Sequence, residues 1–140
     1  MKATPDGEYQ YVVHARDHFS RYSWASPMKS KEAINVSAFL FHIFSQFGPP
    51  TILQTDNGGE FTANVIHELM AMWPETSIIN GRPRHPQSQG SVEKGNAILK
   101  TKLSAWMESN NRNDWSLGLP LVICKYSILS LLNMDHHILY

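Results

Sequence analysis

Two acidic residues, Asp56 and Glu93, stand in polar blocks whose residue types suit metal-ion chemistry. Asp56 lies in residues 55–61 (TDNGGEF), and Glu93 lies in residues 90–96 (GSVEKGN). Carboxylate oxygens are the ligands that Mg²⁺ prefers. Two metal ions held by shared carboxylates can clamp the attacking and leaving oxygens of a phosphoryl transfer. The two blocks therefore predict a metal-dependent site if the fold brings them together.

The residues before Asp56 predict that its carboxylate is aimed by a strand. Residues 51–55 read as a short, mostly apolar strand after a Pro-Pro loop, so Asp56 stands where the strand ends. The following Asn57, Gly58 and Gly59 tolerate positive φ, which favours a sharp turn there. We therefore expect the Asp56 side chain to be exposed at a sheet edge.

Glu93 is expected in the first turn of a helix over residues 91–110. The apolar positions at helical spacing are Val92, Leu99, Leu103 and Trp106. A structural alternative is that Gly90 or Ser91 caps this helix and Glu93 only complements its dipole, which is worth about 0.3–1 kcal/mol. Residues 82–90 form a polar, basic stretch rich in Pro and Gly before the helix, and loops of this kind often contact substrates.

These motifs resemble the catalytic core of retroviral and Gypsy-type retrotransposon integrases. The resemblance rests on residues 55–61, residues 85–90 (HPQSQG) and the pair Glu93-x-x-Asn96, and it covers about residues 8–127. In that family two Asp and one Glu bind two divalent metal ions and drive DNA strand transfer. The resemblance implies catalytic and metal-binding roles for Asp56 and Glu93, with Mg²⁺ or Mn²⁺ as the cofactor.

The first Asp of the family's triad has no counterpart in the sequence. It should precede the hairpin turn predicted at Asp6-Gly7 by a few residues, where no acidic residue stands. Asp6 lies in the turn itself, and Asp17 is interpreted as capping a turn through the backbone of Phe19 or Ser20. Glu60 is interpreted as a solvated turn residue. We therefore expect an incomplete metal site and no strand transfer.

DNA is the partner that the resemblance implies, and no small-molecule substrate is expected. Asn96 and Lys100 share a helix face with Glu93, where they could contact phosphate or base. The expected nucleic-acid-binding residues are Asn96, Lys100, Lys94, Arg82, Arg84 and Gln87. The alternative is that Lys94, Lys100 and Lys102 merely solvate a surface helix. The formal net charge is +0, so a local basic patch would have to bind the nucleic acid.

The sequence predicts one α/β domain over residues 1–140, with an RNase H-like fold. We expect a mixed β-sheet with helices on both faces, its first strand largely missing, and a divergent tail over residues 128–140. The expected strands are 9–15, 22–26, 51–55 and 76–79; the expected helices are 31–47, 64–72, 91–110 and 114–131. Ser30 should cap the first helix, which should bury Val36, Leu40, Ile43, Phe44 and Phe47. The second helix should bury Val65, Leu69 and Met72.

Several further expectations concern partners and location. A single cysteine, Cys124, excludes an internal disulfide and is expected in the core, and a structural zinc site is not expected. Pro120 and Lys125 interrupt the apolar run 117–132, so no membrane span is expected. No secretory signal is present, and we expect an intracellular protein, with the nucleus as a candidate compartment. A homodimer, or a non-catalytic domesticated module that binds protein or nucleic acid, is the alternative function.

Overall fold

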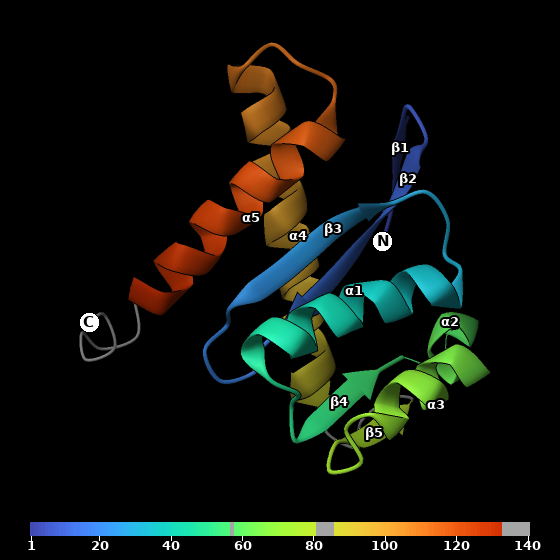
Figure 1. The fold of residues 1–140 in the computed structure, drawn as a ribbon. Helices are drawn as coiled ribbons and strands as arrows, with labels where there is room; N and C mark the ends of the chain where they lie inside the picture. Colours follow the sequence, from blue (N-terminus) through green and yellow to red (C-terminus); the bar gives the residue numbers. More distant parts are fainter. Residues whose placement is uncertain (57, 81–85, 133–140) are drawn as a thin grey trace. The chain divides into compact units, whose positions relative to one another are not determined.

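The computed structural model describes residues 1–56, 58–80 and 86–132; of residues 86–92 it describes the helix to which they belong. The chain divides into two compact units. Unit 1 comprises Met1–Lys29 and Gly90–Tyr140, and unit 2 comprises Ser30–Gln89. Unit 1 is thus built from both ends of the chain and unit 2 from its middle (Figure 1).

Unit 1 contains a three-stranded antiparallel sheet. Its strands are β1 (Lys2–Asp6), β2 (Tyr9–Arg16) and β3 (Ser23–Met28), in the order β1-β2-β3. Gly7, with a φ of 57°, makes the tight turn between β1 and β2. The β2–β3 ladder runs from Tyr11↔Met28 to Arg16↔Ser23. Pro27, expected to end β3, lies inside it, which an edge strand allows because a proline cannot donate to a ladder.

The first strand is shortened rather than largely missing, which corrects the expectation from the sequence. β1 pairs with β2 through Lys2↔Tyr11 and Asp6↔Tyr9. The backbones of Met1 and Val12 exchange two further hydrogen bonds of 2.8 Å. The β1–β2 ladder ends there, so residues 13–16 of β2 extend past it. Five residues are enough for a strand because the turn at Gly7 folds them back onto β2.

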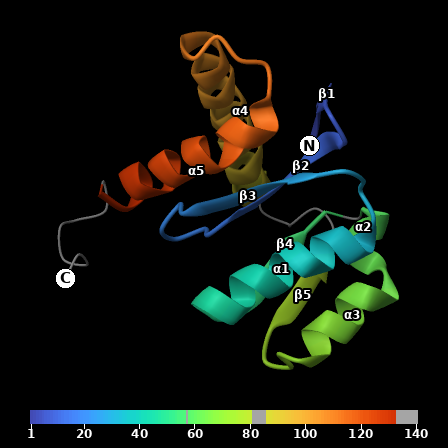
Figure 2. The ribbon, with the colours of Figure 1, turned by 45° about the horizontal axis from the view of Figure 1, so that its top comes forward.

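Two helices, α4 (Pro86–Ser109) and α5 (Trp115–Leu132), cover one face of this sheet (Figure 2). Their buried side chains form a core with β2: Val12, Leu99, Leu103, Trp115, Leu119, Val122, Ile123 and Tyr126. Gly118 of α5 lies against the indole ring of Trp106 in α4, where any side chain would collide with the ring. The absence of a Cβ at Gly118 therefore allows the two helices to approach closely at this crossing.

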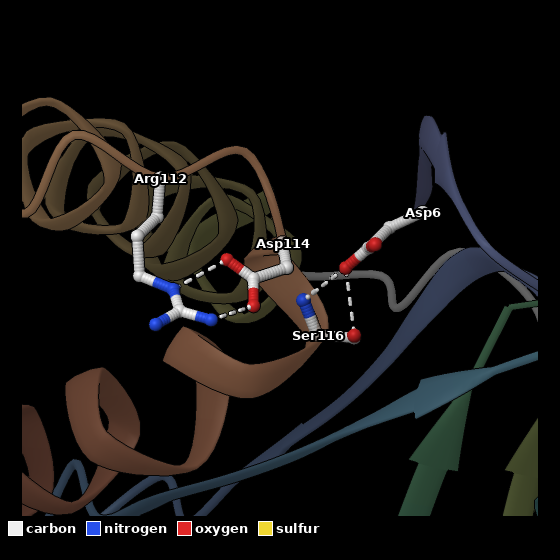
Figure 3. A network of polar contacts seen from close by, with 4 residues as sticks. All are labelled: Asp6, Arg112, Asp114 and Ser116. Carbon is white, nitrogen blue, oxygen red and sulfur yellow. Dashed lines mark hydrogen bonds and ion pairs between the residues drawn. The ribbon is translucent and has the colours of Figure 1, made fainter.

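The side chain of Asp6 and the backbone carbonyl of Thr4, both in β1, secure the start of α5. Asp6 Oδ2 accepts hydrogen bonds from the backbone N and the Oγ of Ser116, at 2.9 and 2.7 Å (Figure 3). Trp115 Nε1 donates to the carbonyl oxygen of Thr4 at 2.7 Å. Ahead of the helix, Arg112 makes a two-pronged ion pair with Asp114. Asp6 thus satisfies one of the free N–H groups that a helix start leaves.

Unit 2 contains a two-stranded parallel sheet and three helices. Its elements are α1 (Ala33–Phe47), β4 (Ile52–Thr55), α2 (Gly59–Thr62), α3 (Asn64–Ala71) and β5 (Ser77–Asn80). The β4–β5 register runs from Ile52↔Ser77 to Thr55↔Asn80. Trp73 joins α1 to the end of α3, because its ring lies edge-on to Phe44 with the centroids 5.5 Å apart. Aromatic packing therefore holds the two longer helices of this unit together.

The last turns of α1 and α3 differ from the expected burial. Val36, Leu40, Ile43 and Phe44 are buried as predicted, but Phe47 is 60% exposed. In α3 the buried residues are Ile66, Leu69 and Met70, and Met72 is 62% exposed. Helical spacing does not say where a neighbouring element stops covering the helix. Ser30 does not cap α1 either, since Glu32 occupies the N-cap position and Ser30 Oγ accepts a hydrogen bond from Asn35 Nδ2.

The outer face of α5 also differs from the sequence expectation. Cys124 is exposed and not in the core. By length and composition α5 could cross a membrane, and 39% of it is buried in the structure. Its exposed large apolar residues are Leu117, Leu121, Ile128, Leu129, Leu131 and Leu132. These six residues are called the α5 apolar face below.

Candidate metal and nucleic-acid site

Asp56 follows β4, as predicted, and its side chain is exposed. Thr55 Oγ1 donates a 2.6 Å hydrogen bond to Asn80 Oδ1, which joins the ends of the two parallel strands directly before Asp56. Asp56 Oδ1 accepts a 2.9 Å hydrogen bond from the backbone N of Gly58. The strand end and the turn therefore fix the backbone that carries this carboxylate.

Glu60 lies close to Asp56, which the sequence did not predict. It is half-buried in α2 rather than a solvated turn residue. A Cβ at Gly58 would lie 2.6 Å from Glu60 Oε2 and 2.9 Å from Asp56 Oδ1, so both carboxylates approach the same glycine. The sequence feature that could have predicted this approach is the presence of two acidic residues on either side of the short turn-forming stretch Asn57, Gly58 and Gly59. A side chain at Gly58 would displace one of these two flexible carboxylates, so glycine allows both to lie here.

Glu93 lies in the third turn of α4, not in the first. The helix begins at Pro86, five residues before the expected start, because the fixed φ of proline suits the first position of a helix. Gly90 and Ser91 are therefore helical residues and not caps. The side chains of Glu93, Lys94 and Lys100 are exposed. A carboxylate and two ammonium groups thus share the outer side of this helix.

Asn96 connects the same stretch of α4 to the sheet. His14 Nδ1 donates a 2.6 Å hydrogen bond to Asn96 Oδ1, and Asn96 is half-buried. A Cβ at Gly95 would lie 2.6 Å from Arg16 Nη1 and 3.2 Å from His14 Cε1. Burial lowers the pKa of His14, and the charges of Arg16 and the N-terminus lower it further, although the Asn96 hydrogen bond opposes them. The sequence did not predict the His14–Asn96 contact. A histidine within an otherwise apolar strand was the feature that could have indicated a polar partner.

The other predicted site residues are only partly covered by the structure. Arg82 and Arg84 lie outside the described residues, and Gln87 belongs to α4 at a position whose side chain is not described. Asp56 lies in unit 2 and Glu93 in unit 1. The convergence of these two carboxylates therefore remains a prediction from the sequence.

All three acidic residues of the segment Met1–Lys29 are engaged by hydrogen bonds or an ion pair with other side chains. Asp6 accepts the hydrogen bonds of Ser116, and Glu8 forms a 2.5 Å ion pair with Lys29. Asp17 Oδ2 accepts hydrogen bonds from the N and the Oγ of Ser20, both at 2.6 Å, which confirms its turn-capping role. Burial raises the pKa of Asp17, but the bonds from Ser20 outweigh it and the net shift is downward.

Comparison with known proteins decides the family. Residues 1–86 match the family model described as "Integrase core domain". The chain belongs to the integrase core domain family. The matched segment of this integrase core includes Asp56 and ends near the start of α4, so Glu93 lies beyond it.

Relatives of this integrase core include human and retroviral proteins. It is 37% identical over 119 residues to the human KRAB-A domain-containing protein 2, covering 85% of this chain and 24% of that relative. It is 34% identical over 116 residues to the Pol polyprotein of radiation murine leukemia virus (strain Kaplan), covering 82% of this chain and 20% of the polyprotein. The chain therefore spans about a quarter or less of either relative.

A crystal structure of the catalytic core of BIV integrase superposes with a TM-score of 0.71 at 24% identity, covering 91% of this chain and 78% of that one. A second match, the cryoEM structure of a simian T-cell lymphotropic virus intasome with the PP2A regulatory subunit B56 gamma, gives a TM-score of 0.67 at 22% identity, with 92% and 44% covered. The α/β, RNase H-like fold predicted from the sequence is confirmed.

The candidate ligand atoms of this integrase core are oxygens, which suit a hard divalent cation, but there are few of them. Asp56 and Glu93 offer exposed carboxylates, and oxygen is the ligand that Mg²⁺ prefers. Within residues 1–56, 58–80 and 86–132, no group of three or more His, Cys, Asp or Glu could hold a metal ion. Among the described residues of each unit taken by itself, there is thus no preformed three-carboxylate site.

Proposed function

We propose that this integrase core binds DNA and that the 140-residue chain does not catalyse strand transfer. The observation that carries the second statement is that Asp6, Glu8 and Asp17 are each engaged by another side chain, Ser116, Lys29 and Ser20 respectively. Two-metal phosphoryl transfer uses carboxylates that are free to bind the ions. Freeing Asp6 would leave the Ser116 N–H without its acceptor, and freeing Asp17 would open the turn at Ser20. Neither is therefore a replacement for the family's first Asp.

Asp56 and Glu93 are the residues that would contribute oxygen ligands to Mg²⁺ or Mn²⁺. The family's chemistry needs a third carboxylate beside them, and Glu60 stands near Asp56 but on the same turn. Two carboxylates bind a divalent ion more weakly than three because each carboxylate adds a negatively charged oxygen ligand that attracts the cation. The expected role of the pair in this chain is weak cation binding beside the DNA.

DNA binding would use the outer side of α4. Lys94 and Lys100 are exposed there, on a helix that the His14–Asn96 hydrogen bond and the Gly95 contact fix to β2. Lysine contacts to phosphate release counterions, so binding should weaken as salt is raised. Because the formal net charge is +0, this local patch and the sequence-predicted Arg82, Arg84 and Gln87 have to supply the attraction.

The DNA-binding proposal is tested by fluorescence anisotropy with a labelled DNA duplex at several salt concentrations. Lys100→Ala should weaken binding several-fold and reduce the slope of log K against log salt by about 1. The matched control is Lys125→Ala, which removes an exposed lysine from α5 in the same unit. Equal effects of the two variants would contradict the assignment of the DNA-binding side to α4.

The proposed lack of catalysis is tested by incubating the chain with DNA ends and Mg²⁺ or Mn²⁺. We expect neither nicking nor strand transfer above the level of an Asp56→Asn, Glu93→Gln double variant. Activity that disappears in both single variants would show that the chain completes its metal site. Such a result would overturn this part of the proposal and leave the DNA-binding part standing.

A second candidate function is association with a copy of itself or another protein through the α5 apolar face. Large exposed apolar patches often mark interaction sites, six large apolar residues of α5 are exposed, and within Trp115–Leu132 only Lys125 is charged. Sedimentation velocity of the chain and of a Leu121→Lys, Ile128→Lys double variant measures self-association. A concentration-dependent increase in sedimentation that only the parent chain shows would support a homodimer.

We further propose an intracellular location, with the nucleus as the compartment in which the DNA is met. The support is the same α4 patch, since chromosomal DNA is the ligand that it would bind. Microscopy of a fluorescently tagged chain tests this, with Lys94→Ala, Lys100→Ala as the variant expected to lose retention on chromatin.

A further inference from the structure

The turn between β2 and β3, residues 17–21, is held in one conformation by hydrogen bonds. Asp17 Oδ2 accepts from the N and the Oγ of Ser20, and Ser20 Oγ accepts from the N of Tyr22 at 3.1 Å. The backbone adds Asp17 N to Tyr22 O at 2.8 Å and Arg21 N to Asp17 O at 3.0 Å. The carboxylate of Asp17 is thus used inside the turn. What the turn presents outward comes from His18, Phe19 and Arg21.

Phe19 is the most exposed large apolar residue of the described chain, at 82%. Single exposed apolar residues are common on proteins and by themselves indicate nothing. Here the residue stands on a bonded turn in which Arg21 has a φ of 63°, a left-handed conformation that costs a non-glycine residue about 1–2 kcal/mol. Such conformations persist where the surrounding bonds enforce them, often at binding sites. The chain therefore holds an aromatic ring in water at a fixed position.

The position of this turn relative to α4 is set within unit 1. The last residues of β2 contact α4 twice, through His14 and Asn96 and through Arg16 and Gly95. Phe19 follows Arg16 by three residues, a span of at most about 10 Å of extended chain. The exposed ring therefore stands on the turn that follows the end of β2 in contact with α4. A strand of nucleic acid that extends beyond that helix toward this turn could meet Phe19.

We propose that Phe19 stacks on an unpaired base of DNA bound along α4. The proposal rests on the proposed DNA binding and names a further residue for it. Aromatic side chains stack on bases without regard to sequence, and cationic neighbours contact the adjoining phosphates. Arg21 brings a positive charge and His18 an imidazole to the same turn, whereas the exposed carboxylate of Asp17 is engaged by two hydrogen bonds from Ser20. This charge distribution favours a nucleic acid strand over an apolar pocket in a protein.

The test compares two labelled duplexes with the same paired sequence, one blunt and one with a single-stranded end of a few nucleotides. Phe19→Ala should weaken binding of the second duplex by about 5- to 150-fold, the range that alanine substitution of a base-stacking aromatic residue gives. Binding of the blunt duplex should stay within about two-fold. Phe19→Trp keeps a ring and should retain the affinity, whereas Phe19→Leu keeps apolar bulk and should lose it.

Phe47→Ala is the matched control, because Phe47 is an exposed phenylalanine in unit 2. If Phe19→Ala and Phe19→Leu leave the affinity for the single-stranded end unchanged while Lys100→Ala weakens both duplexes, the stacking proposal is wrong and the DNA-binding proposal stands. Equal losses for both duplexes also exclude base stacking. If the parent chain binds neither duplex, both proposals are wrong.

Discussion

The helices α4 and α5 lie on the same sheet and share one core, yet their outer sides differ. α4 presents Glu93, Lys94, Lys100 and polar neighbours to solvent, whereas α5 presents the α5 apolar face and only one charge, Lys125. Their inner sides are alike, because Leu99 and Leu119 are both fully buried in the same cluster. The difference teaches that the core of unit 1 does not constrain what each helix offers to partners.

The largest expected effect on stability tests whether the buried sides of α4 and α5 contribute equally to the core. Leu99→Ala in α4 and Leu119→Ala in α5 should each lower the free energy of unfolding by about 2–5 kcal/mol, because each leaves a cavity in a close-packed core. Urea unfolding followed by circular dichroism measures the loss. Leu121→Ala, on the α5 apolar face, should change it by less than about 0.5 kcal/mol. A much smaller loss for one of the two buried leucines would break the comparison.

The crossing of the two helices is tested by Gly118→Ala. Alanine normally stabilises a helix relative to glycine by about 0.5–1 kcal/mol. At Gly118 the added methyl group would meet the ring of Trp106, so we expect a destabilisation of about 1–3 kcal/mol instead. Gly59→Ala in α2 is the control, since nothing lies within 4 Å of its Cβ position. Stabilisation by Gly118→Ala would mean that α4 and α5 adjust at this point.

The two helices also begin differently, and Asp6→Ala tests how much the contact at the start of α5 stabilises the protein. α4 begins with its own Pro86, whereas α5 receives a carboxylate from the β1–β2 turn. Losing a side chain that caps a helix costs about 0.5–2 kcal/mol. Thermal unfolding should show this loss for Asp6→Ala and none for Asp56→Ala, whose carboxylate bonds only within its own turn. An unchanged Asp6 variant would indicate that Trp115 and Thr4 suffice to secure α5.

A smaller, pH-dependent effect concerns the attachment of α4 through His14. Burial lowers the pKa of His14 below its ordinary 6.5, so the folded chain binds the proton less readily than the unfolded chain. The stability from neutral His14 is complete above 6.5 and is lost as the pH falls from there through the lower folded pKa. Urea unfolding at pH 7.5, 6.5 and 5.5 should show this decline, and His14→Gln should reduce it. An equal decline in both proteins would exclude His14 as its source.

The sequence predicted most elements of the fold but not all of their ends. The apolar periodicity located α1, α3, α5 and β4 to within one or two residues. Pro86 was read as part of a loop, although proline is favoured at the first helical position, and this misplaced Glu93 by two turns. Cys124 was expected inside because its neighbours are apolar, but α5 is apolar on its exposed as well as its buried side, so apolar neighbours do not indicate which side is covered.

The sequence predicted those parts of the site that depend on residues close together in the chain. The strand end at Asp56 and the turn at Asp17 followed from short stretches of sequence whose chemistry is local. The contacts His14–Asn96 and Asp6–Ser116 join residues far apart in the chain, and no spacing rule indicates such pairs. Glu60 lay between these cases, because its approach to Asp56 depends on the conformation at Gly58.

The clamp between β1 and α5 sets an order of events during synthesis. Asp6 and Ser116 are separated by 110 positions, so β1 can pair with β2 early but its contacts with α5 must wait until α5 has been made. Ser30–Gln89 is one continuous segment and can make its own contacts while the ribosome is still adding α4 and α5. Contacts between distant residues form slowly because a long loop must close first. The side of β1 that contacts α5 is thus secured late, and a chaperone that holds an exposed strand would act on Lys2–Asp6.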